Sequence, residues 1–410
     1  MGRKEKHIVG LDVGSTKVCT LIAAARETGL EPIGVGVADS KGLKKGAVVN
    51  LEATVESIKK SVSEAEAMAS SEVETVYVGL AGPHVKSFNS RGVTSIPTRT
   101  REINSEDVRR VIETARAVAL SPDREIIHIL PQEFTVDDLT GIGDPHGMVG
   151  TRLEVNVHIV TSSTTAAQNV ITAVNRSGLL VGDTVLEPIA VGEAILTEDE
   201  KELGCVLVDI GGGKTNVAIY HHGAVRHTVV LPLGGELFTN DIAVGLRTSI
   251  PEAERLKRQQ GCALSSMAKD EEVFEVCGIG SRQPRAIAQT VLTEIVQPRA
   301  EEIVHLVRNE IRNAGYERQA GAGVILVGGG AMLHGFVELA EEILDLPVRI
   351  GMSSGFSQSF LENMPQLMGS EFATVTGLVL YGERRRKTYD FHENSNSGLK
   401  KFVAKFRSFL

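Results

Sequence analysis

The sequence predicts an α/β protein built from two related halves, and two observations lead to this prediction. Residues 7–23 and 204–220 are alike: each runs from an apolar, β-rich stretch through Asp-x-Gly and a small polar turn into a second β-rich stretch. Strand and helix patterns then alternate along most of the 410 residues, a length that suits two to three domains or one large bilobed unit. We therefore expect each half to open with a strand, a turn and a returning strand.

The spacing of apolar residues predicts the other elements. Residues 51–69 are expected to form an amphipathic helix, because apolar side chains recur there at a spacing of three to four. Residues 85–160 change character, with a short helix among long strand-like runs, and are expected to be an inserted α+β subdomain. Ser105 is expected to be the N-cap of that short helix. The remaining expected elements are helices at 105–119, 164–177, 252–261, 291–314 and 334–344, and strands at 73–82, 224–231 and 323–330.

Charge is distributed unevenly along the chain. The net charge is −9. Residues 384–410 contain eight Lys or Arg and two Asp or Glu, a net charge of +6, which leaves −15 for the rest. An acidic body with 4% aromatic residues and no Trp argues against a nucleic-acid partner. The four cysteines show no CxxC pairing, and no apolar stretch reaches the ~18 residues that span a bilayer.

The paired Asp-x-Gly turns predict a nucleotide site. Backbone N–H groups of such a turn can cradle phosphate oxygens, and a carboxylate at a strand end suits a hydrated Mg²⁺. One such turn is common in ordinary hairpins, but two on similar strands could grip a triphosphate from both sides. We therefore expect Asp12 and Asp209 to hold Mg²⁺ through water. The run GGGKT is not a P-loop, because Val208 stands where that motif requires glycine and a strand follows it.

Three further features fit a nucleotide site. Gly234 and Gly235 lie between a strand and a helix start, and the glycines at 328–330 lie at another strand–helix junction, where amides can approach a phosphate or a base. Glu254 and Lys257 share a helix face and could flank a ribose and adenine. A solvated ion pair is the alternative for these last two residues.

The order of these features resembles the actin, Hsp70 and sugar-kinase ATPase superfamily. The first phosphate loop at 11–17, the helix LEPIAVGEAIL, the second loop at 209–215 and the GGG loop follow one another as they do there. Nearly the whole chain resembles the FtsA family of bacterial cell-division actin homologues, through GLKKGAVVNLEATVESIKKSV, LPQEFTVDDLTGI, RHTVVLPLGGELFTNDIA and RLKRQQGCAL. The resemblance implies an actin-like (ribonuclease H-like) two-lobed ATPase fold with an inserted α+β subdomain and a C-terminal amphipathic helix.

The resemblance also implies roles for individual residues. Glu187 matches the carboxylate that related ATPases place near the attacking water, so it is expected to be catalytic together with Asp209. Relatives often read DIGGGTTDI at the second loop, whereas Lys214 and Asn216 stand here, and these departures predict at most slow ATP hydrolysis. The expected contacts to ATP and Mg²⁺ are Asp12, Gly14, Ser15, Thr16, Lys17, Gly211, Gly212, Gly213, Lys214, Gly234, Gly235, Glu254, Lys257, Gly328, Gly329 and Gly330.

The implied domain boundaries follow the same family. They are the first lobe at 1–84 and 161–190, the inserted subdomain at 85–160, the second lobe at 191–240 and 301–364, its peripheral subdomain at 241–300, a closing helix of the first lobe at 365–383, a flexible linker at 384–398 and a membrane-targeting helix at 399–410.

The acidic runs at 137–138 and 198–200 are interpreted as solvated turns without partners, and His221–His222 is rejected as a metal site.

The last twelve residues predict a helix that lies in a membrane interface. At ~18 Å such a helix is too short to span a bilayer. One face would be apolar and basic residues would lie elsewhere on the wheel, which suits an anionic lipid surface. A terminal helix packed on the body is the alternative. The residues concerned are Leu399, Phe402, Val403, Phe406, Phe409 and Leu410 on the apolar face, and Lys400, Lys401, Lys405 and Arg407.

The resemblance implies a protein that polymerises and tethers the FtsZ ring to the cytoplasmic face of the cell membrane at the division site. Its implied partners are the C-terminal peptide of FtsZ, further copies of itself, an anionic lipid membrane and other divisome proteins. The peptide is expected on the subdomain around 240–300, where Arg255, Arg258, Arg282 and Arg285 could receive its acidic residues. The alternative functions are a rod-shape or pilus-assembly actin homologue and a sugar kinase, although a kinase has no use for a detached amphipathic tail.

Overall fold

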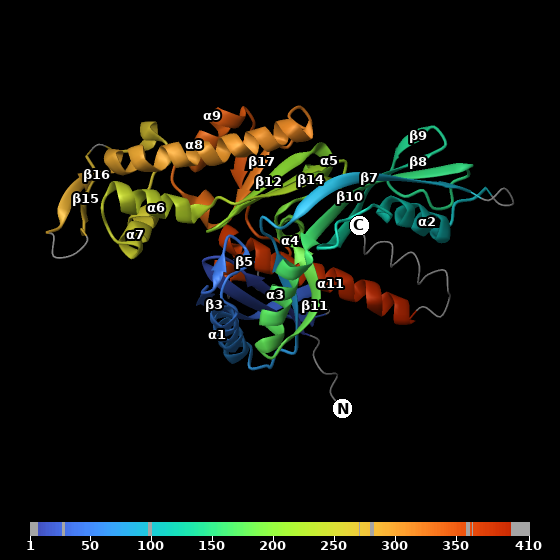
Figure 1. Cartoon of the computed structure of the whole chain (residues 1–410), viewed down its shortest axis with the longest axis horizontal. Helices are drawn as coiled ribbons and strands as arrows, with labels where there is room; N and C mark the ends of the chain where they lie inside the picture. Colours follow the sequence, from blue (N-terminus) through green and yellow to red (C-terminus); the bar gives the residue numbers. More distant parts are fainter. Residues whose placement is uncertain are drawn as a thin grey trace.

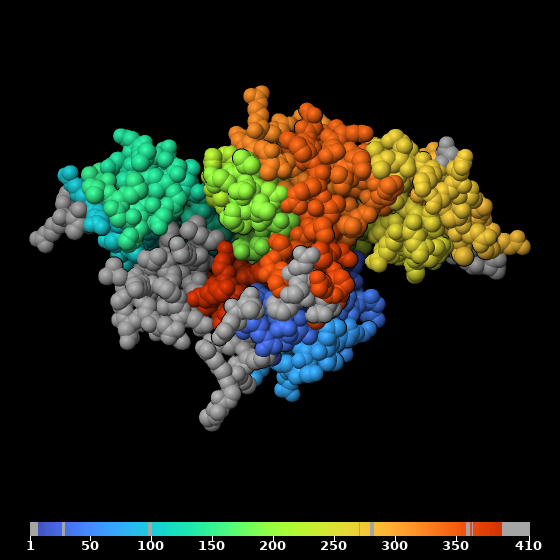
Figure 2. Space-filling view, turned by 180° about the vertical axis from the view of Figure 1, so that it is seen from behind, coloured from blue at the N-terminus to red at the C-terminus, as the bar shows by residue number. Residues whose placement is uncertain are grey.

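The structure, a computed structural model, describes residues 7–26, 29–96, 101–269, 271–278, 283–357, 361–362 and 364–394. The described part has two lobes that lie one above the other in Figure 1. The inserted segment and the segment around 250–290 project from the second lobe at opposite ends of the long axis, as Figure 2 shows from behind.

Each lobe is built on a five-stranded sheet, and the two sheets have the same topology. The strand orders are β11-β6-β1-β2-β3 and β14-β13-β12-β17-β18. In each sheet three consecutive strands form an antiparallel meander, and two later strands join in parallel. This arrangement confirms the prediction of two related halves. The strands are β1 (His7–Val13), β2 (Lys17–Arg26), β3 (Gly29–Asp39), β6 (Thr75–Leu80), β11 (Leu180–Leu186), β12 (Cys205–Ile210), β13 (Thr215–His221), β14 (Ala224–Leu231), β17 (Val324–Val327) and β18 (Val348–Ile350).

Helices cover these sheets because the central strands are apolar on both faces. Every residue of β12 is buried, which requires a layer on each side of the sheet. The predicted helix at 51–69 is confirmed: its N-cap Asn50 accepts a hydrogen bond from the N–H of Ala53, and Val55, Ile58 and Val62 are buried against the first sheet. The helices on the two sheets are α1 (Leu51–Ala69), α3 (Thr164–Arg176), α6 (Gly235–Gly245), α7 (Ile250–Gln260), α8 (Gln289–Ala314) and α9 (Phe336–Leu344).

The inserted segment folds as a four-stranded antiparallel sheet with one helix on it. The strand order is β7-β10-β8-β9, and apolar side chains of α2 and of the strands form a core of their own. Ser105 is not the N-cap of α2, so that prediction is wrong. The N-cap is Asn104, whose side chain accepts from the N–H groups of Glu106 and Asp107. The Asp107 carboxylate in turn accepts from the N–H of Asn104. The elements are β7 (Lys86–Ser95), α2 (Ser105–Arg116), β8 (Arg124–Val136), β9 (Leu139–Ile142) and β10 (Arg152–Ser163).

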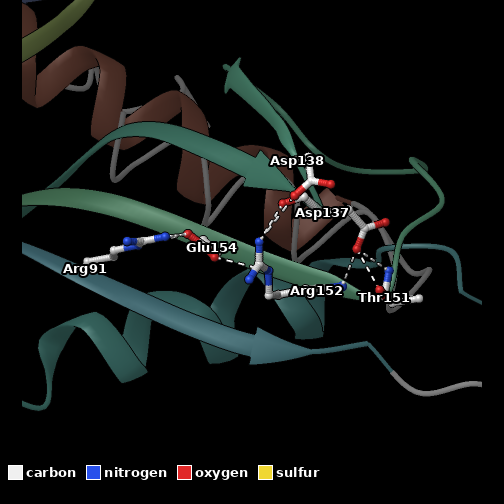
Figure 3. Close-up of polar contacts among 6 residues, drawn as sticks. All are labelled: Arg91, Asp137, Asp138, Thr151, Arg152 and Glu154. Carbon is white, nitrogen blue, oxygen red and sulfur yellow. Dashed lines mark hydrogen bonds and ion pairs between the residues drawn. The ribbon is translucent and has the colours of Figure 1, made fainter.

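The acidic run at 137–138 is a solvated turn, as predicted, but it has partners, which the sequence did not predict. Figure 3 shows Asp137 accepting bonds from the N–H and hydroxyl of Thr151, at 3.0 and 2.7 Å. The Arg152 guanidinium joins this turn to the buried Glu154, at 3.8 Å from Asp138 and 3.2 Å from Glu154. Glu200, in the second acidic run, is also paired, with Arg349 at 2.6 Å.

The inserted sheet docks on the edge strand β14 of the second lobe through polar side chains. The Ser87 hydroxyl donates to the carbonyl of Thr228 at 2.7 Å, and the Gln132 amide donates to the carbonyl of Val225 at 2.9 Å. His158 is buried between them, 2.9 Å from the Thr228 hydroxyl, and burial lowers its pKa to about 3. It is therefore neutral at physiological pH, and the junction carries no buried imidazolium.

Two helices each pack on the lobe opposite to the one they follow in sequence, and they hold the lobes together. Helix α4 (Glu187–Ile195) follows β11 of the first sheet but packs on strands of the second. Helix α11 (Ala373–Asn394) comes from the end of the second half but packs on the first sheet. Where they cross, a Cβ added to Gly377 would lie 1.8 Å from the carbonyl oxygen of Ala190. The crossing therefore requires glycine at position 377.

Helix α11 extends further than the sequence predicts. The segment 365–372 forms two short 3-10 turns, and the helix then continues to Asn394 through the first eleven residues of the predicted linker at 384–398. Its arginines explain this, because Arg384 pairs with Glu193 at 2.8 Å and Arg385 with Asp183 at 2.9 Å. The predicted tail helix at 399–410 lies outside the described residues.

The remaining elements are small. Within the described residues no helix is both long enough and apolar enough to cross a membrane. The small elements are β4 (Leu43–Lys44), β5 (Ala47–Val48), α5 (Glu198–Leu203), β15 (Val273–Val276) and β16 (Arg285–Ala288), and 3-10 turns at Ser265–Met267, Gly329–Met332, Pro365–Met368 and Ser370–Phe372.

Candidate functional site

The two Asp-x-Gly turns adopt the same conformation, one in each lobe. In the first, the N–H of Gly14 donates to the carbonyl of Lys17 at 3.0 Å, and in the second the N–H of Gly211 donates to the carbonyl of Lys214 at 2.9 Å. Each turn joins two antiparallel strands, β1 to β2 and β12 to β13. The return into a strand also confirms that GGGKT is not a P-loop.

The two turns face each other where the two lobes meet. A Cβ added to Gly212 would lie 2.1 Å from the side chain of Thr16, and one added to Gly213 would lie 2.7 Å from the Ser15 hydroxyl. The Ser15 hydroxyl also accepts from the N–H of Gly46 at 3.2 Å. Only glycine permits this approach, so the second turn lies directly on the first lobe.

Asp12 and Asp209 lie at the ends of β1 and β12, as predicted. Asp209 is buried, Asp12 is partly buried, and both lie within electrostatic range of a third carboxylate, the buried Glu187. Burial raises the pKa of Asp12 to about 7, and the charge of Glu187 adds to this. Burial and Glu187 likewise raise the pKa of Asp209 to about 6. Three carboxylates in mutual electrostatic range, two of them buried, require compensating positive charge.

The second turn supplies part of that charge. The Lys214 ammonium is 2.6 Å from Glu187 and donates to the carbonyl of Ala81 at 3.2 Å. The Asn216 amide donates to both Glu187 and Asp209, each at 3.0 Å. The resemblance predicts that Lys214 contacts the phosphates, whereas in the structure its nitrogen contacts Glu187.

The glycine loops of the second lobe close around the second turn. The N–H of Gly235 donates to the carbonyl of Gly211 at 2.8 Å, and a Cβ added to Gly234 would lie 2.6 Å from the same oxygen. Gly328 has φ +84°, and a Cβ there would lie 2.5 Å from the Asp209 carboxylate. A Cβ on Gly330 would lie 2.4 Å from Ile210, whereas Gly329 has open space around it. The predicted loops therefore come together, and Gly329 leaves room for a ligand.

Glu254 and Lys257 are adjacent but are not a free solvated pair. The Lys257 ammonium lies 2.6 Å from Glu254 and donates to the carbonyl of Gly235 at 3.1 Å, so it reaches the Gly–Gly turn. Glu254 also accepts from the Thr239 hydroxyl at 2.5 Å, and hydrogen bonds from Lys257 and Thr239 outweigh burial and lower its pKa to about 2. The pair is therefore anchored at the edge of the loop cluster, where a ribose contact was predicted.

Lys17 occupies the position in the first turn that Lys214 occupies in the second. Its ammonium donates to the carbonyl of Glu371 at 2.7 Å and lies 4.0 Å from the centre of the Phe372 ring. Both partners lie in the 3-10 turn just before α11, and neither the carbonyl nor the ring carries a charge. The predicted phosphate contact of Lys17 is not tested by this geometry.

Sequence reasoning missed several residues that shape the site. Gly46 and Ala81 of the first lobe contact Ser15 and Lys214, and the N–H of Gly328 donates to the carbonyl of Ser370 at 3.3 Å. These residues act through backbone atoms, which leave no side-chain motif. Among these residues only Gly46 stands in a stretch that the sequence singles out, because GLKKGAVVNLEATVESIKKSV resembles the family.

The donor set fits a hydrated magnesium ion. No cluster of three or more His, Cys, Asp or Glu side chains is arranged to hold a metal within the described ranges, His221 and His222 included. Mg²⁺ keeps most of its water and takes one or two carboxylates, which Asp12 and Asp209 supply. The Oδ1 of Asn216 is also buried with no hydrogen-bond partner in the described part of the chain, so the site has an unused acceptor.

Three of the four arginines predicted to bind a peptide already have partners in the structure. Arg255 pairs with Glu252 at 2.7 Å, Arg258 pairs with Glu254 at 2.8 Å, and Arg285 donates to the carbonyl of Leu246. Arg282 lies outside the described residues. Peptide binding there stays a prediction, and any acidic peptide would have to share these donors.

A separate cavity of about 370 Å³ lies behind the crossing of α4 and α11. It is lined by β8, both helices and the β13–β14 turn, and it shares no residue with the two Asp-x-Gly turns. Its charged groups are balanced, with Asp183, Glu193 and Glu198 against Lys201, Arg384 and Arg385. The paired turns, and not this cavity, combine glycine-lined backbone with buried carboxylates.

Comparison with known proteins agrees with this geometry. The family model described as "Cell division protein FtsA" matches residues 206–377, and that described as "SHS2 domain inserted in FTSA" matches residues 82–161. The chain is 44% identical to the cell division protein FtsA of Pseudomonas aeruginosa over 93% of its own length and 90% of that protein. It is 41% identical to FtsA of Neisseria meningitidis over 92% and 91%. It is 40% identical to FtsA of Bacillus subtilis over 83% and 78%.

Solved structures share the fold at low sequence identity. A chain of the PilM-PilN type IV pilus biogenesis complex superposes with a TM-score of 0.64 at 18% identity, covering 92% of this chain and 98% of that one. MreB5 of Spiroplasma citri bound to ADP superposes with a TM-score of 0.55 at 16% identity, covering 95% and 99%. The fold is therefore the actin-like two-lobed fold with an inserted subdomain.

Proposed function

The chain belongs to the FtsA family of actin-like cell-division proteins, and on that premise we propose that it binds Mg-ATP between its lobes and links a division ring to the membrane. Family membership sets aside the sugar-kinase and rod-shape alternatives. Binding of ATP would bias lobe closure and self-assembly more than it would drive rapid turnover.

One observation carries the nucleotide proposal. Two turns with the same backbone hydrogen bond face each other from opposite lobes, and each follows a strand that ends in an aspartate whose pKa is raised by burial. Backbone N–H groups of the turns would hold the β- and γ-phosphates, and Asp12 and Asp209 would orient water bound to Mg²⁺. Mg²⁺ would neutralise charge that develops on the phosphates, and Gly328–Gly330 with Lys257 and Glu254 would border the adenosine.

Affinity for Mg-ATP is expected to rise between pH 6 and pH 8. With a pKa of about 7, Asp12 is mostly protonated at pH 6, so the ion must displace a proton there. Because the pKa is raised, the folded, metal-free protein holds this proton more tightly than the unfolded chain does. The carboxyl therefore stabilises the metal-free fold at low pH, and this stabilisation is lost as the pH rises through 7. Titration calorimetry should show about tenfold tighter binding at pH 8 than at pH 6.

The Asp12→Asn variant separates the effect of Asp12 on the pH dependence from the effect of the nucleotide's own titration. That variant keeps the volume but loses the titrating group, so the part of the pH slope that it lacks belongs to Asp12. Equal slopes in parent and variant would contradict the assignment of Asp12 to the cation.

Membrane attachment is proposed for the tail at 399–410, which lies outside the described residues. The support is the sequence: six apolar side chains on one helical face, four basic residues elsewhere on the helical wheel, and a net charge of −15 on residues 1–383. Attachment by one short helix would be weak, and many tails on one filament would act together. The location that follows is the cytoplasmic face of the membrane at the division site.

Partner binding is proposed from family membership alone. The partners are the C-terminal peptide of FtsZ, on the region of α7 and β16, further copies of this chain in a filament, and other divisome proteins. In that region Arg258 pairs with the partly buried Glu254 and Arg285 donates to the carbonyl of Leu246, and a bound peptide would share these two donors.

A further inference from the structure

Lys214 forms a buried ion pair beside the two Asp-x-Gly turns. Its ammonium is 2.6 Å from Oε1 of Glu187, and the two side chains are only 6% and 4% exposed. Oε2 of Glu187 accepts from the Asn216 amide at 3.0 Å. Both oxygens of Glu187 are therefore engaged by side chains of the second lobe.

The same lysine also crosses from one lobe to the other. Lys214 lies on the turn between β12 and β13, whereas Ala81, whose carbonyl accepts from it at 3.2 Å, follows β6 of the first lobe. The neighbouring Gly213 faces Ser15 and the backbone of Lys45. Lys214 thus fastens the second turn to the first lobe with atoms of the chain itself.

The first turn provides an internal comparison. Lys17 has the equivalent place, but its ammonium contacts a carbonyl and an aromatic ring, and it forms no ion pair with a carboxylate of the described residues. A lysine at this point of the turn therefore does not by itself require a carboxylate partner. The Lys214–Glu187 pair is a feature of the second turn.

We propose that Lys214 is an internal clasp that holds the lobes closed and withholds Glu187 from the water that would attack ATP. This rests on the proposed nucleotide site. In hydrolysis the water oxygen bonds to the γ-phosphorus, the bond to the bridging oxygen breaks with its electron pair leaving on ADP, and a water proton passes to a carboxylate and then to solvent. A carboxylate already bound to an ammonium and an amide is a poor acceptor for that proton. Lys214 is a positioning residue that acts through Glu187.

Lys214→Met tests the clasp, because methionine keeps the apolar stem and removes the ammonium. Turnover of Mg-ATP by the full chain is expected to rise at least tenfold. The gain should disappear in Lys214→Met/Glu187→Gln. Lys214→Arg retains the cation and should keep the slow parental rate. Lys59→Met makes the same change in the exposed pair with Glu56 and serves as the matched control.

Binding of a fluorescent ATP analogue, measured on the same samples, separates the outcomes. If the parent binds no nucleotide, the proposed function fails. If Lys214→Met binds nucleotide but turns over at the parental rate, or gains turnover that survives Glu187→Gln, the clasp is wrong while the nucleotide site stands. If Lys214→Met folds but loses nucleotide, the lysine is a phosphate ligand and the clasp is again wrong.

Hydrogen exchange on the parent chain tests the clasp without any variant. The amides of 211–214 and of 81–82 are expected to be protected in nucleotide-free protein, with little further protection when Mg-ATP is added. Fast exchange of both segments without nucleotide, followed by strong protection with Mg-ATP, would show that the ligand and not Lys214 closes the lobes.

Discussion

Gly377→Ala is expected to disrupt the crossing of α4 and α11. The new Cβ would lie 1.8 Å from the carbonyl oxygen of Ala190, and backbone on the facing helix cannot move aside as a side chain can. Alanine favours a helix over glycine by about 1 kcal/mol, but overpacking of this kind typically costs ~1–3 kcal/mol and more where backbone must move. We expect a net loss of at least ~2 kcal/mol in the free energy of unfolding.

Chemical denaturation and hydrogen exchange of the two helices measure this effect. Amides in α4 and α11 should exchange faster in the variant, because the crossing joins the lobes. Gly143→Ala is the control, since a Cβ there meets nothing within 4 Å. Parental stability in Gly377→Ala would mean that the helices can separate at no cost, which would contradict the close crossing.

Phe406→Glu is expected to release the full chain from anionic liposomes. The substitution removes a phenyl group, whose burial contributes ~1.5–3 kcal/mol, and places a charge in the middle of the apolar face. Co-sedimentation with anionic liposomes should fall more than tenfold, while Mg-ATP binding should be unchanged. High salt should weaken the parent only in part, because screening removes the contribution of Lys and Arg and leaves the apolar one.

Ser408→Glu is the matched control for that experiment. It introduces the same charge two residues away, on the opposite side of the helical wheel, and should reduce liposome binding much less. Equal sedimentation of Phe406→Glu and the parent would instead support a terminal helix packed on the body, and the membrane proposal would fail.

Periodic and repeated features were predictable from the sequence. The two Asp-x-Gly hairpins and the helix at 51–69 were recognised because strands and helices leave a local pattern of apolar residues. The approach of the two turns followed from their similarity alone. Asp12 and Asp209 end their strands as predicted, and the glycine loops at 234–235 and 328–330 lie beside the second turn.

Features that depend on distant partners were not predictable. The run Arg384–Lys387 was interpreted as linker because its composition is polar, but Glu193 and Asp183, some 200 residues earlier, pair with its arginines and the helix continues. The family resemblance predicts Lys214 against phosphate, whereas in the structure Glu187, on another element, accepts from its ammonium. Neither partner is visible in local sequence.

Titration of Mg-ATP into the parent, Asp12→Ala and Asp209→Ala tests the central claim most directly. Each variant removes one of the two carboxylates that face the phosphates from opposite lobes. The account predicts one Mg-ATP per parent chain and well over tenfold weaker binding in each variant, a ratio that needs only ~1.4 kcal/mol. Parental affinity in both variants would contradict a nucleotide site between the two turns.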